Sequence, residues 1–530
     1  MKNVDKRIVA VAIVVAVAVA GYFAYTQFFQ QTPQEKVLII ARTNKPSSLD
    51  PAYIVWTNDY AIGANIYSTL IGYKPGTREM YGDLAESWEV SENGTVYIFH
   101  LRKGVKFHKG YGELKASDVK FTFERILDPK TNARYPDFFK SIDHIEVIDD
   151  YTIKFVLKYP DSAFLTYIAP WRNSFIVSQK AVEELGKDFS FNPVGTGPFM
   201  FESWDSETGD VVLVANPDYY GEKPKVDKVI YKVIEDPYTA YLALERGEVD
   251  IVALDTSISG LLERAKSNPN VKVYEKIGGG SLSITFNLNH PILKDVRVRR
   301  AIAYAINKTE IVQGLLKGTV VEAKGFLSPA YIGYTEDVPQ YPYDPEKAKQ
   351  LLAEAGYPNG FEIDFYTPSS GVYPKIATII QAQLAKVGIK VNIRQMDFAA
   401  WLEATVVTGK AELSFMPLGG RPPESVVIFT NLFSFDPTKD KPTGINFMWY
   451  DGLVDLLKKM QREPDLQKRI ELYRQAQVKI MQDLPLYPIY WSKVYVATGV
   501  WVKNFNIDDF NSHGDWLEYV DIDLSKKPKP

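Results

Sequence analysis

Residues 344–420 alternate between helical and strand patterns, and this alternation constrains the fold more than any other feature of the chain. Asp344 can cap a helix that has proline at its first position and ends at Gly356. The segments that follow are, in order, strand, helix, strand, helix and strand, at Phe361–Thr367, Tyr373–Val387, Ile389–Gln395, 397–407 and Ala411–Met416. Helices of this length between strands indicate an α/β sheet covered by helices.

The stretch Asp83–Arg125 predicts a compact unit of strands and one helix. Apolar residues alternate on both sides of an Asn-Gly turn, which indicates a hairpin over Ser87–Leu101. A short strand is expected at Val105–His108. Ser117 can then cap a helix whose first turn carries an aspartate, where a negative charge meets the positive helix end. The core face of this helix is predicted to hold Val119, Phe123 and Ile126.

Composition limits the class of protein. The chain has 530 residues, which is too long for one ordinary domain and enough to bury several cores. Its hydrophobic content of 46% and charged content of 24% are typical of a globular protein. A net charge of −4 lacks the basic excess that nucleic-acid binding requires, so no nucleic-acid partner is expected. Because no cysteine is present, disulfides, thiolate metal sites and cysteine nucleophiles are excluded.

The N-terminus predicts a membrane anchor. Basic residues precede Ile8–Tyr25, an uncharged apolar run that would span roughly 27 Å as a helix. The positive flank places the start of the chain in the cytoplasm and the rest on the extracellular face of the cell membrane. Phe28–Lys36 is a polar tether. The run is long and ends in aromatic residues, which favours an uncleaved single-pass signal anchor; the alternative is a cleaved signal peptide and a secreted protein.

Several motifs together resemble one known family. LAESWEVSENGTVYIFHLRKGVKFH at 84–108, followed by the helix KASDVKFTFER at 115–125, is similar to the signature of family 5 extracellular solute-binding proteins of ABC importers. These proteins bind oligopeptides, dipeptides or nickel. Other segments match the family in the same order over roughly 38–500, and they are LDP at 49–51, NPVGTGPF at 192–199, NPDYYGEKPKVDKVIYKVI at 216–234, FNLN at 286–289 and DVRVRRAIAYAINKTEIV at 295–312.

The resemblance implies an α/β, two-lobed periplasmic-binding-protein-like fold of type II, in its large three-subdomain form. It implies four divisions of the chain: the cytoplasmic stub, anchor and tether at 1–36, lobe 1 at 37–285 with an extra subdomain at about 60–190, lobe 2 at 286–495, and a return to lobe 1 with a tail at 496–530. A ligand would lie between the lobes, and the closed form, a monomer, would dock on ABC permease subunits.

No catalytic constellation is found in the sequence. Phosphate-binding and nucleophile-elbow motifs are missing, and no two histidines are spaced to chelate zinc on a helix. Gly278–Ser281 is glycine-rich but lacks the context of a dinucleotide site, so a turn is predicted there. We therefore expect no catalytic residue, metal or cofactor and no enzymatic activity. An extracellular hydrolase is kept as a remote alternative.

In the peptide-binding members that this chain resembles, two segments pair with the extended ligand. The first corresponds to Ile54–Asn58 and the second to Ser414–Glu424. In the family an aspartate of the second segment binds the ammonium group of the ligand, and here Arg421 occupies that position, with Glu424 as a possible replacement. Since arginine is a donor without acceptors, it suits a carboxylate or a hydroxyl. The predicted contacts from these segments are Val55, Trp56, Thr57, Asn58, Gly419, Gly420 and Arg421.

Aromatic residues supply the remaining candidates. Saccharide-binding members of the family use aromatic stacking, and several rings here lie in or beside segments that face the cleft in the family. The candidates are Phe398, Phe447, Trp449 and Trp491. Core packing is the alternative explanation for each of them, and Trp56 and Phe398 are favoured as contacts. An oligopeptide is the expected ligand, with an oligosaccharide held by the same machinery as the alternative.

Overall fold

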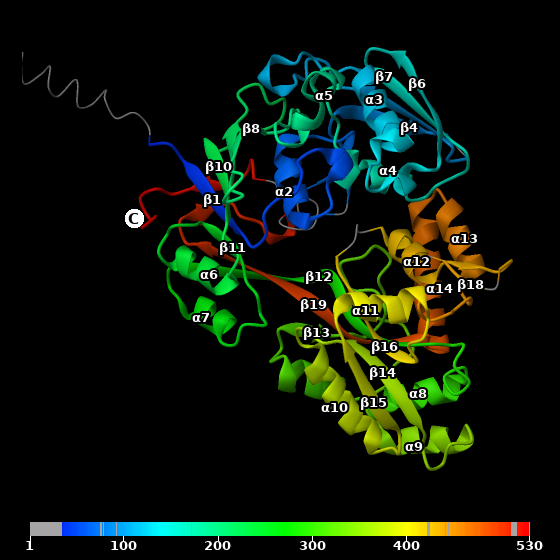
Figure 1. Cartoon of the computed structure of the whole chain (residues 1–530). Helices are drawn as coiled ribbons and strands as arrows, with labels where there is room; N and C mark the ends of the chain where they lie inside the picture. Colours follow the sequence, from blue (N-terminus) through cyan, green and yellow to red (C-terminus); the bar gives the residue numbers. More distant parts are fainter. Residues whose placement is uncertain are drawn as a thin grey trace, which may run out of the picture.

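The computed structural model describes residues 34–74, 77, 79–91, 93–170, 172–420, 424–439, 441–443, 445–509 and 517–528. In this part of the chain no helix is both long enough and apolar enough to cross a bilayer. The predicted membrane span, Ile8–Tyr25, lies outside the described residues. The described residues form two α/β lobes (Figure 1).

One mixed sheet runs through both lobes. The strands lie in the order β15-β14-β16-β12-β19-β11-β1-β10-β9-β8, and β13 adds to β19. Parallel pairs join β14 to β15 and β16, and β1 to β10 and β11, while the other pairs are antiparallel. The bounds are β1 Val37–Arg42, β8 Phe199–Trp204, β9 Val211–Ala215, β10 Lys228–Val233, β11 Ile251–Ala253, β12 Val271–Phe286, β13 Val320–Glu322, β14 Glu362–Pro368, β15 Lys390–Met396, β16 Leu413–Leu418 and β19 Leu486–Gly499.

The N-terminal half adds a separate four-stranded sheet in the order β4-β5-β7-β6. Helix α3 contacts β6 and β7 of this sheet (Figure 1). The elements here are β2 Ile71–Tyr73, β3 Met80–Gly82, β4 Ala85–Val90, β5 Val96–Leu101, β6 Ile142–Asp149, β7 Thr152–Leu157, α2 Thr57–Ile66, α3 Ala116–Leu127, α4 Phe164–Ile168, α5 Gln179–Leu185, α6 Pro237–Glu245 and α7 Leu261–Ser267. Short 3-10 turns are η1 Pro51–Tyr53, η2 His108–Gly110, η3 Pro129–Thr131, η4 Pro136–Phe139, η5 Arg172–Ser174 and η6 Gly186–Ser190.

In the C-terminal half, helices alternate with strands as the sequence pattern predicts. Asp344 caps α9 with Pro345 at its first position, and Asp397 caps α11. The elements are α8 Val296–Ala305, α9 Pro345–Glu354, α10 Tyr373–Ala385, α11 Phe398–Leu402, α12 Ser425–Phe433, α13 Val454–Arg462, α14 Leu466–Asp483, the π-helical turns η7 Glu310–Leu315 and η8 Glu403–Val407, the 3-10 turn η9 Ile507–Asp509, and the short strands β17 Phe435–Asp436, β18 Lys441–Pro442, β20 Val502–Lys503 and β21 Asp521–Ile522.

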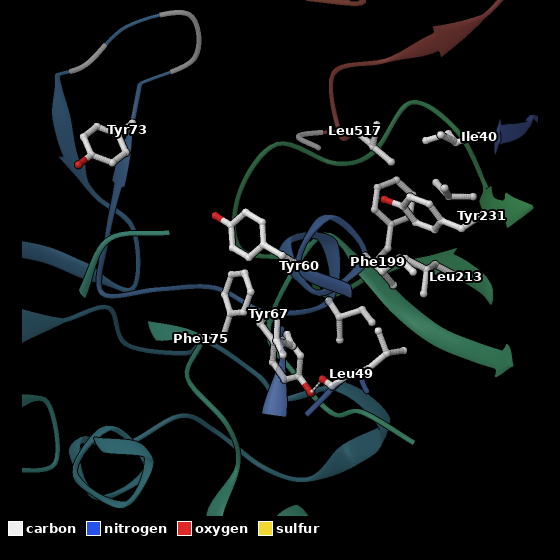
Figure 2. Close-up of a cluster of buried hydrophobic side chains, with 14 of the residues drawn as sticks. Ile40, Leu49, Tyr60, Tyr67, Tyr73, Phe175, Phe199, Leu213, Tyr231 and Leu517 are labelled. Carbon is white, nitrogen blue, oxygen red and sulfur yellow. Dashed lines mark hydrogen bonds between the residues drawn. The ribbon is translucent and has the colours of Figure 1, made fainter. Parts of the chain in front are cut away.

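The buried apolar residues fall into three clusters. One cluster takes its members from residues 38–271 and 495–522, and we call the part packed around it lobe 1. The other two take theirs from 282–490, apart from Ala163, and define lobe 2. Figure 2 shows part of the first cluster, in which Phe175 stacks between Tyr60 and Tyr67 with ring centroids 5.4 and 5.7 Å away. The Tyr67 hydroxyl donates to the carbonyl of Leu49 at 2.9 Å, so the polar end of this buried ring has a hydrogen-bond partner.

Two long strands, β12 and β19, connect the lobes (Figure 1). Val271 at the start of β12 belongs to the lobe 1 cluster, whereas Leu282 belongs to lobe 2. The turn predicted at Gly278–Ser281 is wrong, because these residues lie inside β12. The register against β19 shifts between Ile277 and Ser281, so the glycines accommodate an irregularity where the strand passes between the lobes.

The lobes also meet at a second place. The amide of Ser162, in lobe 1, donates to the carbonyl of Gln461, in lobe 2, at 2.9 Å. Ala163 is buried within a lobe 2 cluster, and a side chain at Gly94 would touch Pro464 at 3.2 Å. The lobes are therefore joined through two strands and touch again at the extra four-stranded sheet.

The hairpin predicted at Ser87–Leu101 is confirmed as β4 and β5, but two details beside it are wrong. The short strand expected at Val105–His108 is reduced to one bridge between Lys106 and Glu113. Helix α3 starts at Ala116 instead of being capped by Ser117. The N-cap residue is Lys115, two residues before Ser117, and the Asp118 carboxylate at the third helical position accepts from the Lys115 amide at 3.0 Å.

Candidate ligand-binding site

Part of the first predicted ligand segment lines an open pocket in lobe 1. Val55 and Trp56 follow η1 in extended backbone and border a cavity of about 650 Å³. Trp56 is 62% exposed, although its indole is among the largest apolar surfaces in the chain. The other lining residues are Ser47, Ser48, Tyr53, Arg134 and Tyr135. Aromatic walls with a few polar groups are typical of small-molecule sites.

A buried ion pair stabilises the turn that carries the pocket residue Tyr53. The Arg125 guanidinium donates twice to the Asp50 carboxylate, with N–O distances of 2.9 and 2.6 Å. Asp50 also accepts from the amide of Ala52 at 3.0 Å, which caps η1. Arg125 lies 5.9 Å from the centre of the Tyr53 ring. One carboxylate therefore fixes both the turn before Trp56 and the helix α3 that supplies the arginine.

Helix α2 begins directly after Trp56. Asp59 in its first turn accepts from the amide and hydroxyl of Ser47, at 3.0 and 2.6 Å. Burial raises the pKa of the Asp59 carboxyl, and the hydrogen bonds from Ser47 act in the opposite direction. Thr57 is exposed and Asn58 donates to the carbonyl of Asn44, and neither borders the pocket. Because α2 already starts at Thr57, Thr57 and Asn58 are helical and do not belong to the extended segment.

Two of the aromatic candidates of lobe 2, Phe398 and Phe447, pack against one ring, that of Trp401. The ring of Phe398 lies 5.3 Å from that of Trp401, and Phe447 packs edge-on against Trp401 at 6.2 Å. Phe398 is 58% exposed and Trp401 only 2%. Trp401 donates its indole N–H to the hydroxyl of Ser414 at 2.9 Å. Phe398 therefore presents a free ring face, Phe447 is half-buried, and Trp401 is their support.

Trp449 lies elsewhere on lobe 2, beside the start of β16. It adopts a left-handed backbone with φ of 54° and is half-buried. A side chain at Gly409 would come within 2.9 Å of its indole nitrogen. The strained backbone aims this ring at the Gly409 turn, so packing against a glycine explains its position.

The glycine candidates follow the end of β16. Gly419 and Gly420 are exposed, and a side chain added at either would meet no described neighbour. In contrast, a side chain at Gly279 of β12 would fall 2.7 Å from the Tyr331 hydroxyl and 3.3 Å from the α-carbon of Gly420. The β12 glycines thus let the backbone after β16 approach closely.

Trp491 reaches the same β12 segment from the other side. It pairs with Ser281, which on its other edge pairs with Leu418. Trp491 is 2% exposed and packs edge-on against Tyr334 at 5.5 Å. Its indole N–H has no hydrogen-bond partner within the described part of the chain. The faces of this ring are covered in the structure and only its polar edge is unsatisfied, so ligand contact by Trp491 stays a prediction.

Arg421 lies outside the described residues. Glu424, the possible replacement for the aspartate of the family, is 3% exposed. Its carboxylate accepts from the hydroxyl of Tyr473 and from the Arg469 guanidinium, the latter at 3.3 Å. Because these two donors already occupy it, Glu424 is committed to lobe 2 and does not supply a free anion to a ligand.

The structure thus brings the predicted residues together in separate groups: Val55 with Trp56 at the lobe 1 pocket, Phe398 with Phe447, and Gly419 and Gly420 near Trp491 at β12. Tyr53, Arg134 and Tyr135 line the same pocket as Trp56 and were missed by sequence analysis. The signal available was weak, an arginine and a tyrosine in a turn before Pro136. No group of acidic or histidine side chains in the described ranges is arranged to hold a metal ion.

Comparison with known proteins identifies the family of this chain. The model of the bacterial extracellular solute-binding proteins, family 5, matches residues 79–440. The chain belongs to this family. It is 31% identical to the dipeptide-binding protein of Escherichia coli, over 91% of this chain and 94% of that protein.

Two solved structures show a similar fold. One is the ABC transporter-associated periplasmic binding protein DppA from Helicobacter pylori in complex with the peptide STSA, which is 32% identical with a TM-score of 0.73 over 92% of this chain and 98% of that one. The other is HbpA2 from Haemophilus parasuis, which is 30% identical with a TM-score of 0.84 over 92% of this chain and all of that one. The two-lobed fold expected from the sequence is therefore confirmed.

Proposed function

We propose that this chain is the ligand-capturing subunit of an ABC importer and binds short peptides between its two lobes. The observation that carries the proposal is the open pocket of about 650 Å³ walled by Tyr53, Trp56 and Tyr135. Family membership supplies the transport role, and the relatives named for dipeptides or solved with a peptide favour this ligand class. Closure of lobe 2 would then cover the ligand by hinge motion at β12 and β19.

The proposed location of the protein rests on the apolar run near its N-terminus. Ile8–Tyr25 would anchor the protein as a single span, with both lobes on the extracellular face and the tether leading to β1 at Val37. The division into lobe 1 at 37–285, lobe 2 at 286–495 and a returning segment at 496–530 is supported by the buried clusters, which change membership near these points. The closed monomer would deliver the ligand to the permease subunits.

An oligosaccharide is the second candidate. It is favoured by the two exposed rings, since Trp56 and Phe398 offer faces of the kind that stack on sugars. Arg421, at the position where relatives bind an ammonium group, would also donate to hydroxyls. Peptide side chains use the same ring faces, so direct binding has to separate the two ligands.

A thermal-shift panel with the full-length protein tests the proposal. Di- to pentapeptides and α- and β-linked oligosaccharides are each added at 1 mM. A ligand at 100 times its dissociation constant stabilises the folded state by about 2.7 kcal/mol. We expect peptides to raise the melting temperature. If only sugars raise it, the peptide proposal fails, and if mass spectrometry finds a hit cleaved, the protein is a hydrolase. Arg421→Asp should improve binding of peptides with a free amino terminus.

A further inference from the structure

The lobe 1 pocket carries a charge of one sign. Among the described residues that line it, only Arg134 has a side chain that is charged at neutral pH. It is exposed, and its guanidinium makes no hydrogen bond or ion pair with any residue in the described ranges. An arginine presents five donors in a planar fork that matches a carboxylate.

The other charges near the pocket are already compensated. Arg125 is paired with Asp50 through two hydrogen bonds, and both are largely buried. Asp59 is bonded to Ser47 on the helix side. Lys45, two residues before the lining serines, turns away and donates to the carbonyl of Glu207 at 2.5 Å. Arg134 therefore sets the local electrostatic preference.

The backbone of Arg134 is held on both sides. Its amide donates to the carbonyl of Ala52 at 2.9 Å, and the Tyr53 hydroxyl donates to the carbonyl of Thr131 at 2.9 Å. After it, Tyr135 stacks on Phe138 with ring centroids 5.6 Å apart, and Phe138 stacks on Tyr167 at 4.8 Å. The fixed backbone places the free guanidinium at the pocket, so a ligand would have to order only the side chain of Arg134 and not the loop that carries it.

We propose that Arg134 makes this pocket selective for solutes that carry a carboxylate, with the anion at the guanidinium and the adjoining part of the ligand against Trp56. This inference rests on the proposed function and names the substrate class of the same site. In a peptide the carboxylate can be the C-terminus or an acidic side chain. A neutral sugar lacks the group that the guanidinium would bind.

The test compares Arg134→Gln with wild type, using the full-length protein. The probes are one library of di- to pentapeptides prepared as free acids and as C-terminal amides, including amides with and without internal aspartate. Arg462→Gln is the matched control, because Arg462 is an exposed arginine of α13 whose guanidinium makes no hydrogen bond or ion pair with the described residues. Thermal shift finds the binders, and calorimetry gives their dissociation constants.

We expect free acids to bind about 10-fold or more tightly than their amides, and this preference to disappear in Arg134→Gln but persist in Arg462→Gln. Amides that bind only when they contain aspartate would assign the carboxylate to a side chain. Equal binding of acids and neutral amides, or an unchanged preference in Arg134→Gln, overturns the inference and leaves peptide capture intact. If no peptide of either form binds, peptide capture itself fails.

Discussion

Each lobe exposes one of the two favoured contact rings, Trp56 in lobe 1 and Phe398 in lobe 2, but the lobes support these rings in different ways. In lobe 1, Trp56 stands on a turn fixed by the buried ion pair of Asp50 and Arg125. In lobe 2, Phe398 stands on the buried ring of Trp401. Ion-pair support is directional and fails when either partner is lost, whereas ring packing weakens with the volume removed. Equivalent surfaces can thus have different sensitivities to mutation.

Replacing Asp50 should give the largest effect. Asp50→Ala leaves the Arg125 guanidinium buried without its partner and removes the cap of η1, so the free energy of unfolding should fall by about 3–5 kcal/mol. Urea unfolding measures it. The double variant Asp50→Leu with Arg125→Met removes both charges and should recover much of the loss. A single variant within 1 kcal/mol of wild type would contradict ion-pair support of the lobe 1 wall.

Trp401→Ala tests the other support. It removes a buried indole and its hydrogen bond to Ser414, and we expect a loss of about 3–4 kcal/mol in the free energy of unfolding. Trp401→Phe keeps most of the volume and should lose about half as much, a graded response that the lobe 1 ion pair should not show. Similar losses in both variants would mean that the hydrogen bond to Ser414, and not ring packing, holds Phe398 in place.

Much of the fold could be predicted because its signals are local. The Asn-Gly turn gave the β4–β5 hairpin, and the caps at Asp344 and Asp397 gave the starts of α9 and α11. The turn predicted at the glycine run Gly278–Gly280 is wrong because glycine is common both in turns and where two backbone segments approach closely. Only the neighbours, Tyr331 and the backbone at Gly420, decide between these meanings.

The site was harder to predict because the type of a residue does not determine whether its side chain is buried. Trp56 and Trp491 are both tryptophans that the sequence predicts at the cleft, yet the first is exposed and the second is covered. Arg134 lies far from Trp56 in the sequence, and the amide bond to Ala52 that brings it to the pocket depends on tertiary folding. Residue types and spacing could not reveal that contact.

The polar interior of lobe 1 should also make it sensitive to acid. His108 accepts from the amide of Gly195 and donates to the carbonyl of Gly197, and burial lowers its pKa to about 4. The folded pKa lies below the unfolded value, so the unfolded chain binds more protons; stability is full above pH 6.5 and is lost as the pH falls toward 4. In lobe 2, burial lowers the pKa of Lys308 to about 8, so its proton uptake occurs at alkaline pH.

We expect the His108 contribution to decline by about 2–3 kcal/mol between pH 7 and pH 4.5. The measurement is the difference in unfolding free energy between wild type and His108→Gln at several pH values, which cancels the opposite trend from Asp83, whose pKa burial raises to about 6. The same substitution at His100, a residue of β5 whose side chain is 42% exposed, is the control. Parallel pH curves for wild type and His108→Gln would exclude this histidine as the acid-sensitive group.

The smallest effects concern the exposed rings themselves. Trp56→Ala should leave the free energy of unfolding within about 0.5 kcal/mol, because the ring has few protein contacts to lose, but should weaken binding of a peptide hit about tenfold. Phe398→Ala should weaken the same ligand by only about threefold, since its ring is smaller and Trp401 remains beneath it. Calorimetry with both variants gives the loss of affinity for each ring and so compares the contributions of Trp56 and Phe398 to binding. Equal losses would show that the ligand contacts both rings alike, and an unchanged affinity in Trp56→Ala would remove the lobe 1 pocket from the binding site.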